Sequence, residues 1–140
     1  METITTAYLD ASVFIASIVT TDAQGRKARD ILQAVAESRI QGYTATLTFD
    51  EVVYIVRMMA GSVNSIPAGE HFLRIQNLKF IDVTYESIVG AQELIKKYNL
   101  KPRDAIHAAC AIQRRIPIII SQDKDFDKIK ELKRKKIEDV

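Results

Sequence analysis

Short runs of apolar and β-branched residues recur along the chain, each bounded by polar or turn-forming residues. Runs of this kind predict β-strands. The run Ile118, Ile119 and Ile120 suits a strand that is buried on both faces, as in a parallel sheet. The predicted strands are Thr5 to Leu9, Gly42 to Leu47, Leu78 to Val83 and Pro117 to Ser121.

The segments between these runs carry apolar residues three and four positions apart, which predicts helices. This alternation predicts a three-layer α/β/α fold, in which helices cover both faces of a mainly parallel sheet of four or five strands. Lys136 to Val140 is the candidate for a fifth strand, at an edge. The predicted helices are Ser12 to Val19, Gln24 to Arg39, Phe49 to Ala60, Ile66 to Gln76, Tyr85 to Tyr98 and Pro102 to Arg115.

The composition indicates one globular unit. With 140 residues, 47% of them hydrophobic, the chain is long enough for one sizeable core, so we expect residues 1–140 to form a single domain. No apolar run approaches the roughly 20 residues that a membrane helix needs, and the single cysteine, Cys110, lies in a predicted helix, so we expect a cytoplasmic protein. The net charge of +2 is too small to indicate a nucleic-acid partner. A basic cluster between Lys128 and Lys136 fits either phosphate contacts or a solvated helix face.

Acidic residues follow the predicted strands, at the carboxyl ends where an open parallel sheet forms its ligand-binding cleft. Asp10 follows the first strand, Glu51 opens the helix after the second, and Asp123 follows the fourth. Asp104 begins the helix that leads into the fourth strand, and we expect packing to bring it near the others. Mg²⁺ and Mn²⁺ prefer carboxylate oxygens, whereas acids that meet without a cation repel one another. The sequence therefore predicts a metal site able to hydrolyse phosphodiester bonds.

Each of these acids also has an ordinary structural interpretation. Thr48 to Glu51 reads T-x-x-E, the pattern of a helix capping box. Asp104 lies in a first helical turn, where any carboxylate is favourable. The remaining acids are placed to cap helices, namely Asp10 the helix near Ser12, and Asp123 or Asp125 a final helix at Gln122 to Lys130.

Four segments, in order along the chain, resemble the motifs of the PIN-domain family, in particular those of the compact VapC-like toxin ribonucleases of type II toxin–antitoxin pairs. The resemblance spans nearly the whole chain and is most specific in the third segment. The segments are YLDASVFIA, TLTFDEVVYIV, KPRDAIHAACA and SQDKDF.

The resemblance implies an endoribonuclease that uses Mg²⁺ or Mn²⁺, acts on RNA, is often a homodimer and is inhibited by a small antitoxin protein. It implies that Ser12 supports the first acid of the site. Two alternatives stay open: a PIN-type RNA-processing nuclease outside a toxin–antitoxin pair, and a catalytically silent RNA-binding module. The catalytic and metal-binding residues that the resemblance implies are Asp10, Glu51, Asp104 and Asp123, with Asp125 as second choice for the fourth position.

Three further residues are candidates for supporting roles. Ser121 is placed to position water or metal, although a hydroxyl at a strand end is equally typical of a helix cap. His107 shares a helix face with Asp104, and Arg103 lies beside that acid, so both are candidates for substrate contact. His107 is also a candidate for orienting Asp104, with packing or hydrogen bonding as the ordinary role of such a histidine. Apolar residues on the helices between residues 49 and 76 predict a surface for self-association or for the antitoxin.

Overall fold

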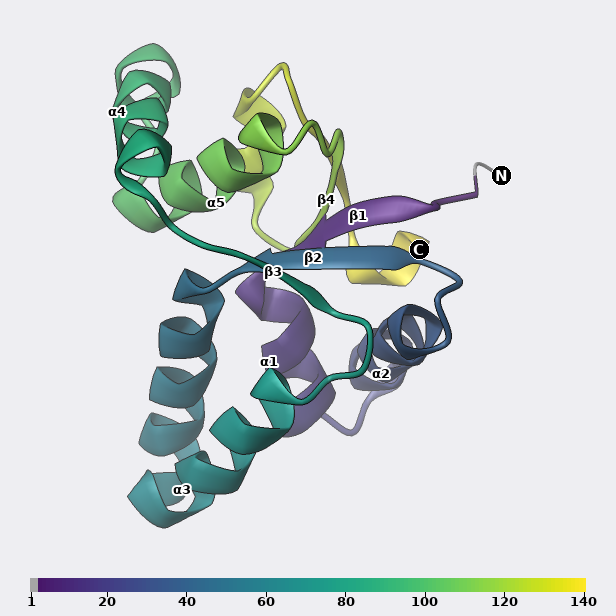
Figure 1. Cartoon of the computed structure of the whole chain (residues 1–140). Coiled ribbons are helices and arrows are strands. Elements are labelled where there is room, and N and C mark those ends of the chain that lie inside the picture. The colour runs from purple at the N-terminus through teal and green to yellow at the C-terminus, as the bar shows by residue number, and fades with distance from the viewer. Residues whose placement is uncertain (1–2) are drawn as a thin grey trace.

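The computed structural model describes residues 3–140, which form one five-stranded sheet covered by helices on both faces (Figure 1). The strand order is β3-β2-β1-β4-β5, and every neighbouring pair is parallel. This is the three-layer α/β fold that the alternation of strands and helices predicts. The strands are β1 (Thr6–Leu9), β2 (Gln41–Ala45), β3 (Lys79–Ile81), β4 (Ile118–Ile120) and β5 (Lys133–Lys135).

The central strand, β1, sends alternate side chains to opposite faces of the sheet, as the two-residue period of a strand requires. Ala7 and Leu9 belong to the core beneath the sheet in Figure 1, and Tyr8 belongs to the core above it. Leu9 pairs with Ile120 of β4 across the sheet. The residues that directly follow β1 and β4 therefore lie side by side at one edge.

Three helices and a short 3-10 helix cover the lower face in Figure 1. Their apolar stripes bury a core that includes Phe14 and Phe72, whose rings meet edge to face with centroids 4.9 Å apart. The elements of this layer are α1 (Ala11–Val19), α2 (Ala23–Ala36), α3 (Leu47–Leu73) and the 3-10 helix η2 (Ile137–Asp139).

Two helices cover the upper face, together with a 3-10 helix, η1 (Lys124–Lys128). They are α4 (Tyr85–Tyr98) and α5 (Pro102–Gln113). The buried face of α5 consists largely of alanines, and these small side chains let the helix approach the sheet closely. The close approach carries the polar residues of α5 to the carboxyl edge of the strands.

The helix α3 is bent back on itself at Gly61, as Figure 1 shows. Gly61 has φ 89° and ψ 165°, a conformation that favours glycine. In the second arm, a Cβ on Gly69 would lie 3.1 Å from side-chain atoms of Phe49 and Val53 in the first arm, so the arms pack closely. The prediction of two helices between residues 49 and 76 is therefore correct, and the break falls at the glycine.

Two predictions for the C-terminal region are wrong. The fifth strand is Lys133–Lys135 and not Lys136 to Val140, because the chain leaves the sheet to bury Ile137 in the lower core, where the Ile137 N–H donates to Gln122. The proposed final helix at Gln122 to Lys130 is only the short 3-10 helix η1. The basic cluster therefore spans the end of η1, a loop and the edge strand β5, and does not lie on one helix face.

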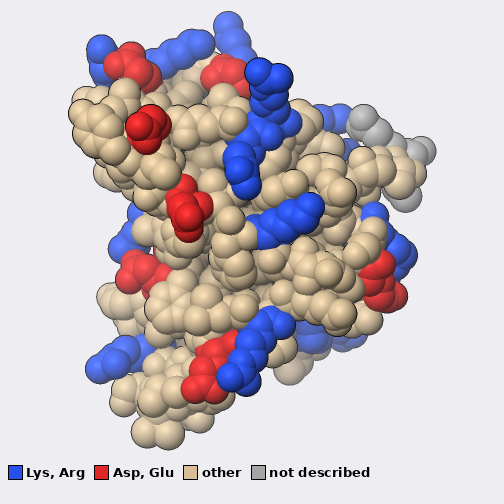
Figure 2. Space-filling view, viewed as in Figure 1, with Lys and Arg blue, Asp and Glu red and all other residues tan. Residues whose placement is uncertain are grey.

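The charged surface agrees with the small net charge. Basic and acidic side chains are interspersed over the face shown in Figure 2. Within residues 3–140, no helix combines the length and the apolar character needed to cross a bilayer.

Candidate active site

Asp10 directly follows β1 at the carboxyl edge of the sheet, and its backbone N–H donates to Ile120 of β4. The residue is only 7% exposed. One carboxylate oxygen, Oδ2, accepts hydrogen bonds from the hydroxyls of Ser121 (2.8 Å) and Ser12 (3.2 Å). Although Asp10 occupies the cap position of α1, its side chain makes no capping hydrogen bond. The capping interpretation of Asp10 is therefore wrong.

Glu51 lies in the first part of α3, where its carboxylate contacts Nε2 of His107 on α5. The capping-box interpretation of Thr48 and Glu51 is also wrong, because α3 begins at Leu47, before Thr48. Thr48 is a buried residue within the helix and not its cap. The hydroxyl of Thr48 bonds instead with that of Thr44 (2.7 Å).

His107 is fully buried and links Asp10 and Glu51. These three residues form the first of two groups of possible ligands. Its Nε2 lies 3.7 Å from Oδ1 of Asp10, and its Nδ1 is hydrogen-bonded to the hydroxyl of Tyr8. Burial alone would lower the pKa of His107, but the hydrogen bond to Glu51 and the charges of Asp10 and Glu51 outweigh burial and raise it. The ligand atoms of Asp10, Glu51 and His107 all lie within 4.8 Å of one another.

A second group contains Asp104 at the start of α5, Asp123 at the N-cap of η1 and Asp125 within η1. Oδ2 of Asp104 is buried and has no hydrogen-bond partner within residues 3–140. Burial, the charges of Asp123 and Asp10, and a hydrogen bond with Asp123 raise the pKa of Asp104 to about 7. The charge of His107 lowers that pKa, but burial and the neighbouring carboxylates outweigh it.

The segment that carries Asp123 and Asp125 is held by hydrogen bonds within itself and with Ser121, whose carbonyl is bound by Arg134. The Asp125 N–H donates to Oδ1 of Asp123, so the capping interpretation of Asp123 is correct for one of its oxygens. The hydroxyl of Ser121 accepts the N–H of Asp123 (3.0 Å) while it donates to Asp10, and so joins the two groups. Arg134 on β5 donates to the Ser121 carbonyl and to both carboxylate oxygens of Asp127.

The structure thus brings the acids predicted from the sequence to one edge of the sheet, as two neighbouring groups. In each group three ligand atoms are close enough to bind one cation. Carboxylates arranged in this way suit Mg²⁺ or Mn²⁺.

The model of the PIN domain family matches residues 7–132, which include all of these acids. The chain belongs to the PIN-domain family. No curated protein matches the sequence.

Solved structures similar to this PIN domain include toxin–antitoxin proteins. VapBC2 of Rickettsia felis, bound to a DNA fragment from its promoter, gives a TM-score of 0.72 at 16% identity and covers 94% of this chain and 98% of that chain. Mycobacterium tuberculosis VapC20, described as a sarcin–ricin-loop-cleaving toxin, gives 0.71 at 17% identity, with 86% and 92% covered. A Klebsiella pneumoniae toxin–antitoxin complex gives 0.67 at 20% identity, with 91% and 95% covered. At these identities the likeness concerns the fold.

The remaining candidate from the sequence, Arg103, lies at the surface of the PIN domain. Arg103 is exposed and forms an ion pair (3.6 Å) with Asp50, the equally exposed residue that precedes Glu51. Sequence reasoning missed Tyr8 and Arg134, which support the site from β1 and β5. Neither has a local pattern that would identify it.

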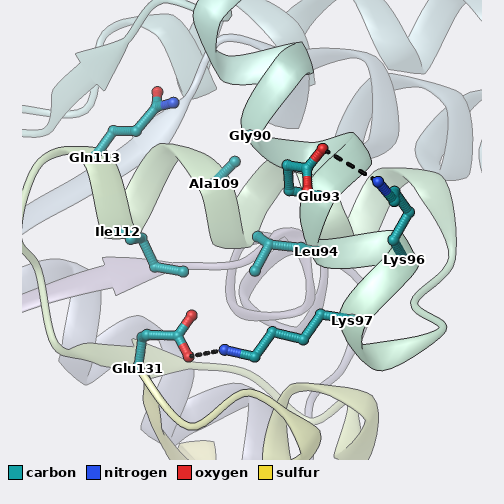
Figure 3. Close-up of a pocket in the computed structure, with 9 residues that line it drawn as sticks. All are labelled: Gly90, Glu93, Leu94, Lys96, Lys97, Ala109, Ile112, Gln113 and Glu131. Carbon is teal, nitrogen blue, oxygen red and sulfur yellow. Dashed lines mark ion pairs between the residues drawn. The ribbon is translucent and has the colours of Figure 1, made fainter.

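A hollow of about 530 Å³ lies between α4 and α5 of the PIN domain and contains none of the acids described above (Figure 3). Two ion pairs lie along it, Glu93 with Lys96 (3.7 Å) and Lys97 with Glu131 (3.8 Å). Its apolar part is formed by Gly90, Leu94, Ala109 and Ile112.

Proposed function

We propose that this PIN domain is a metal-dependent endoribonuclease and the toxin of a type II toxin–antitoxin pair. The observation that carries the proposal is the meeting of acids from four separate segments at one sheet edge, where one of them, Asp104, has a buried oxygen without a partner. We assign the catalytic and metal-binding roles to Asp10, Glu51, Asp104 and Asp123, with Asp125 as an additional ligand.

The donor set fits a hard divalent cation. Five carboxylates supply oxygen ligands, and hard cations of this kind bind through carboxylates and water. Burial raises the pKa of Asp104, the charges of Asp123 and Asp10 raise it further, and a cation would relieve that repulsion. Mg²⁺ and Mn²⁺ are the candidate cofactors, and the bound cation would activate water and neutralise charge on the phosphodiester.

The residues around the acids restrict how the carboxylates move. Hydrogen bonds from Ser12 and Ser121 fix one oxygen of Asp10, which leaves Oδ1 facing Glu51 and His107. Because Asp10 is almost fully buried, little bulk water would compete with its carboxylate for a bound cation. Groups held in this way need little reorganisation when substrate binds.

The relatives of known structure support RNA cleavage and an antitoxin partner. One is described as a toxin that cleaves the sarcin–ricin loop, and others are toxin–antitoxin complexes. Our proposal extends these properties to this chain and includes a cytoplasmic location. The matching fold and the acids at its sheet edge support that extension.

Exposed apolar side chains on α3 support a protein partner, either a second copy in a homodimer or the antitoxin. Patches of this kind mark interaction sites when they are contiguous. The side chains concerned are Tyr54, Met58, Met59, Val63 and Ile66.

The purified protein is expected to cleave RNA in Mg²⁺ or Mn²⁺ and to stop when the metal is chelated. Asp10→Asn removes a ligand charge with little change of volume, so it should lower cleavage by at least about 100-fold while the circular dichroism spectrum stays unchanged. Asp50→Asn is the matched control, because Asp50 is exposed and pairs only with Arg103 among the contacts described. Equal cleavage by the wild type and Asp10→Asn would overturn the proposal.

Expression in cells distinguishes a toxin from a processing nuclease. A toxin should halt growth, the Asp10→Asn variant should not, and a short neighbouring reading frame should encode a protein that restores growth. Metal-dependent cleavage without growth arrest would favour a processing nuclease. Metal-independent RNA binding without cleavage would favour a silent module.

A further inference from the structure

The buried imidazole of His107 has both of its nitrogens occupied by partners from different layers of the fold. We propose that His107 is a positioning residue that holds the carboxylate of Glu51 in place, and that Tyr8 in turn holds His107. This inference rests on the proposed function, because Glu51 is assigned there as a metal ligand. It assigns to the histidine a role that its sequence position alone does not indicate.

The hydrogen-bond chemistry fixes where the proton of His107 lies. An ionised carboxylate only accepts hydrogen bonds, so the contact with Glu51 requires a proton on Nε2. This holds for the neutral ring and for the charged ring. The lone pair of Nε2 is therefore not free for a metal ion, and His107 acts on the site through Glu51.

Tyr8 occupies the other ring nitrogen. Its hydroxyl bonds to Nδ1 of His107 and accepts the backbone N–H of Ala45 at the end of β2 (3.2 Å). A tyrosine hydroxyl offers one donor proton and acceptor lone pairs. It can donate to a neutral His107 or accept from a charged one.

The chain of contacts crosses the three layers of the fold. Tyr8 belongs to the central strand, His107 to α5 above the sheet, and Glu51 to α3 below it. A glutamate side chain loses considerable rotamer freedom when it is fixed. A rigid, fully buried ring that is itself anchored to the sheet removes that freedom before any cation binds.

The test compares Mn²⁺ affinity, measured by electron paramagnetic resonance, in four variants. His107→Phe keeps a ring and removes the donor, and we expect Mn²⁺ to bind at least about 10-fold more weakly. His107→Gln keeps an N–H for Glu51, so its affinity should stay within about threefold of the wild type. Tyr8→Phe should lie between them. Leu94→Ala is the control, a buried residue of α4 in the same core, and should bind Mn²⁺ as the wild type does.

Affinity unchanged in His107→Phe would overturn the inference. Nitrogen coupling to bound Mn²⁺ in an electron spin-echo experiment would also overturn it, because such coupling would make His107 a ligand. We expect no such coupling in the wild type. If His107→Phe does not fold, the comparison of His107→Gln, Tyr8→Phe and Leu94→Ala still decides between positioning and mere packing.

A metal-free measurement separates this inference from the proposed function. Nuclear magnetic resonance of the imidazole nitrogens should show a proton on Nε2 of His107 in the wild type. The resonance should move strongly in Glu51→Ala. Failure of the wild type to bind Mn²⁺ would defeat the proposed function, whereas an Nε2 resonance that is unchanged in Glu51→Ala would defeat the positioning role.

Discussion

The two acidic groups at the sheet edge are held in different ways. In the first group, Asp10 accepts two serine hydroxyls and Glu51 contacts the imidazole of His107. In the second group, Asp125 pairs with Lys128 (3.5 Å), and burial together with the charges of Asp123 and Asp10 raises the pKa of Asp104. The first group is thus ordered by hydrogen bonds within the protein, whereas Asp104 in the second group has a buried oxygen without a hydrogen-bond partner among the described residues.

The two groups would therefore contribute to cation binding in different ways. Hydrogen bonds fix the carboxylates of the first group before a cation arrives, which limits the ordering that binding must supply. Ionising the partly buried Asp104 beside Asp123 and Asp10 costs folding free energy, and a bound cation would offset that cost. Ser121 joins the groups through hydrogen bonds to Asp10 and to the Asp123 N–H, so the two are mechanically coupled.

The largest expected effect on cleavage concerns Asp104 of the second group. Asp104→Asn should lower metal-dependent RNA cleavage by at least about 100-fold, because it removes the ligand charge that the cation balances. Initial rates on a fluorescent RNA, over a range of Mn²⁺ concentrations, measure the effect. Full recovery of the rate at high Mn²⁺ would show that Asp104 contributes affinity alone.

A smaller effect is expected where the protein supplies the hydrogen bonds. Ser121→Ala removes the shorter of the two serine contacts to Asp10 and the link to Asp123, and should lower cleavage by about 10-fold. Ser12→Ala removes the 3.2 Å contact and should cost about threefold. Both are measured in the same assay. The reverse order of the two effects would contradict the coupling through Ser121.

The smallest effect concerns stability without metal. The folded pKa of Asp104, about 7, lies above that of an unfolded aspartate, so the folded protein holds the proton more tightly. Stability should therefore fall as the pH rises from about 4 to about 7 and then level off. Asp104→Asn should flatten this fall, with a higher Tm than the wild type at pH 8 and a similar Tm near pH 4. A lower Tm at pH 8 in thermal denaturation with chelator would contradict the account.

Much of the fold follows from local patterns. The run Ile118, Ile119 and Ile120 identified a buried strand because parallel strands are apolar on both faces. The first of the two helices predicted between residues 49 and 76 ended at Ala60, next to the break at Gly61, whose φ of 89° favours glycine. The basic residues of Lys133–Lys135 concealed β5, because an edge strand needs little apolar surface.

The site was predictable in its acids and not in their partners. Asp10 and Asp123 could be placed because the ends of parallel strands share an edge of the sheet. Tyr8 and His107 are 99 positions apart in the sequence, and no spacing pattern links them. The T-x-x-E pattern at Thr48 misled because α3 begins earlier, at Leu47. Contacts between distant segments depend on how the layers pack, which local patterns do not encode.

The central claim is that these acids form one cation-dependent centre, and a Mn²⁺ titration followed by isothermal calorimetry at pH 8 tests it most directly. We expect saturable binding by the wild type, with affinity lowered by at least about 10-fold in both Asp10→Asn and Asp104→Asn and unchanged in Asp50→Asn. Absence of saturable binding, or equal binding by all four proteins, would contradict it.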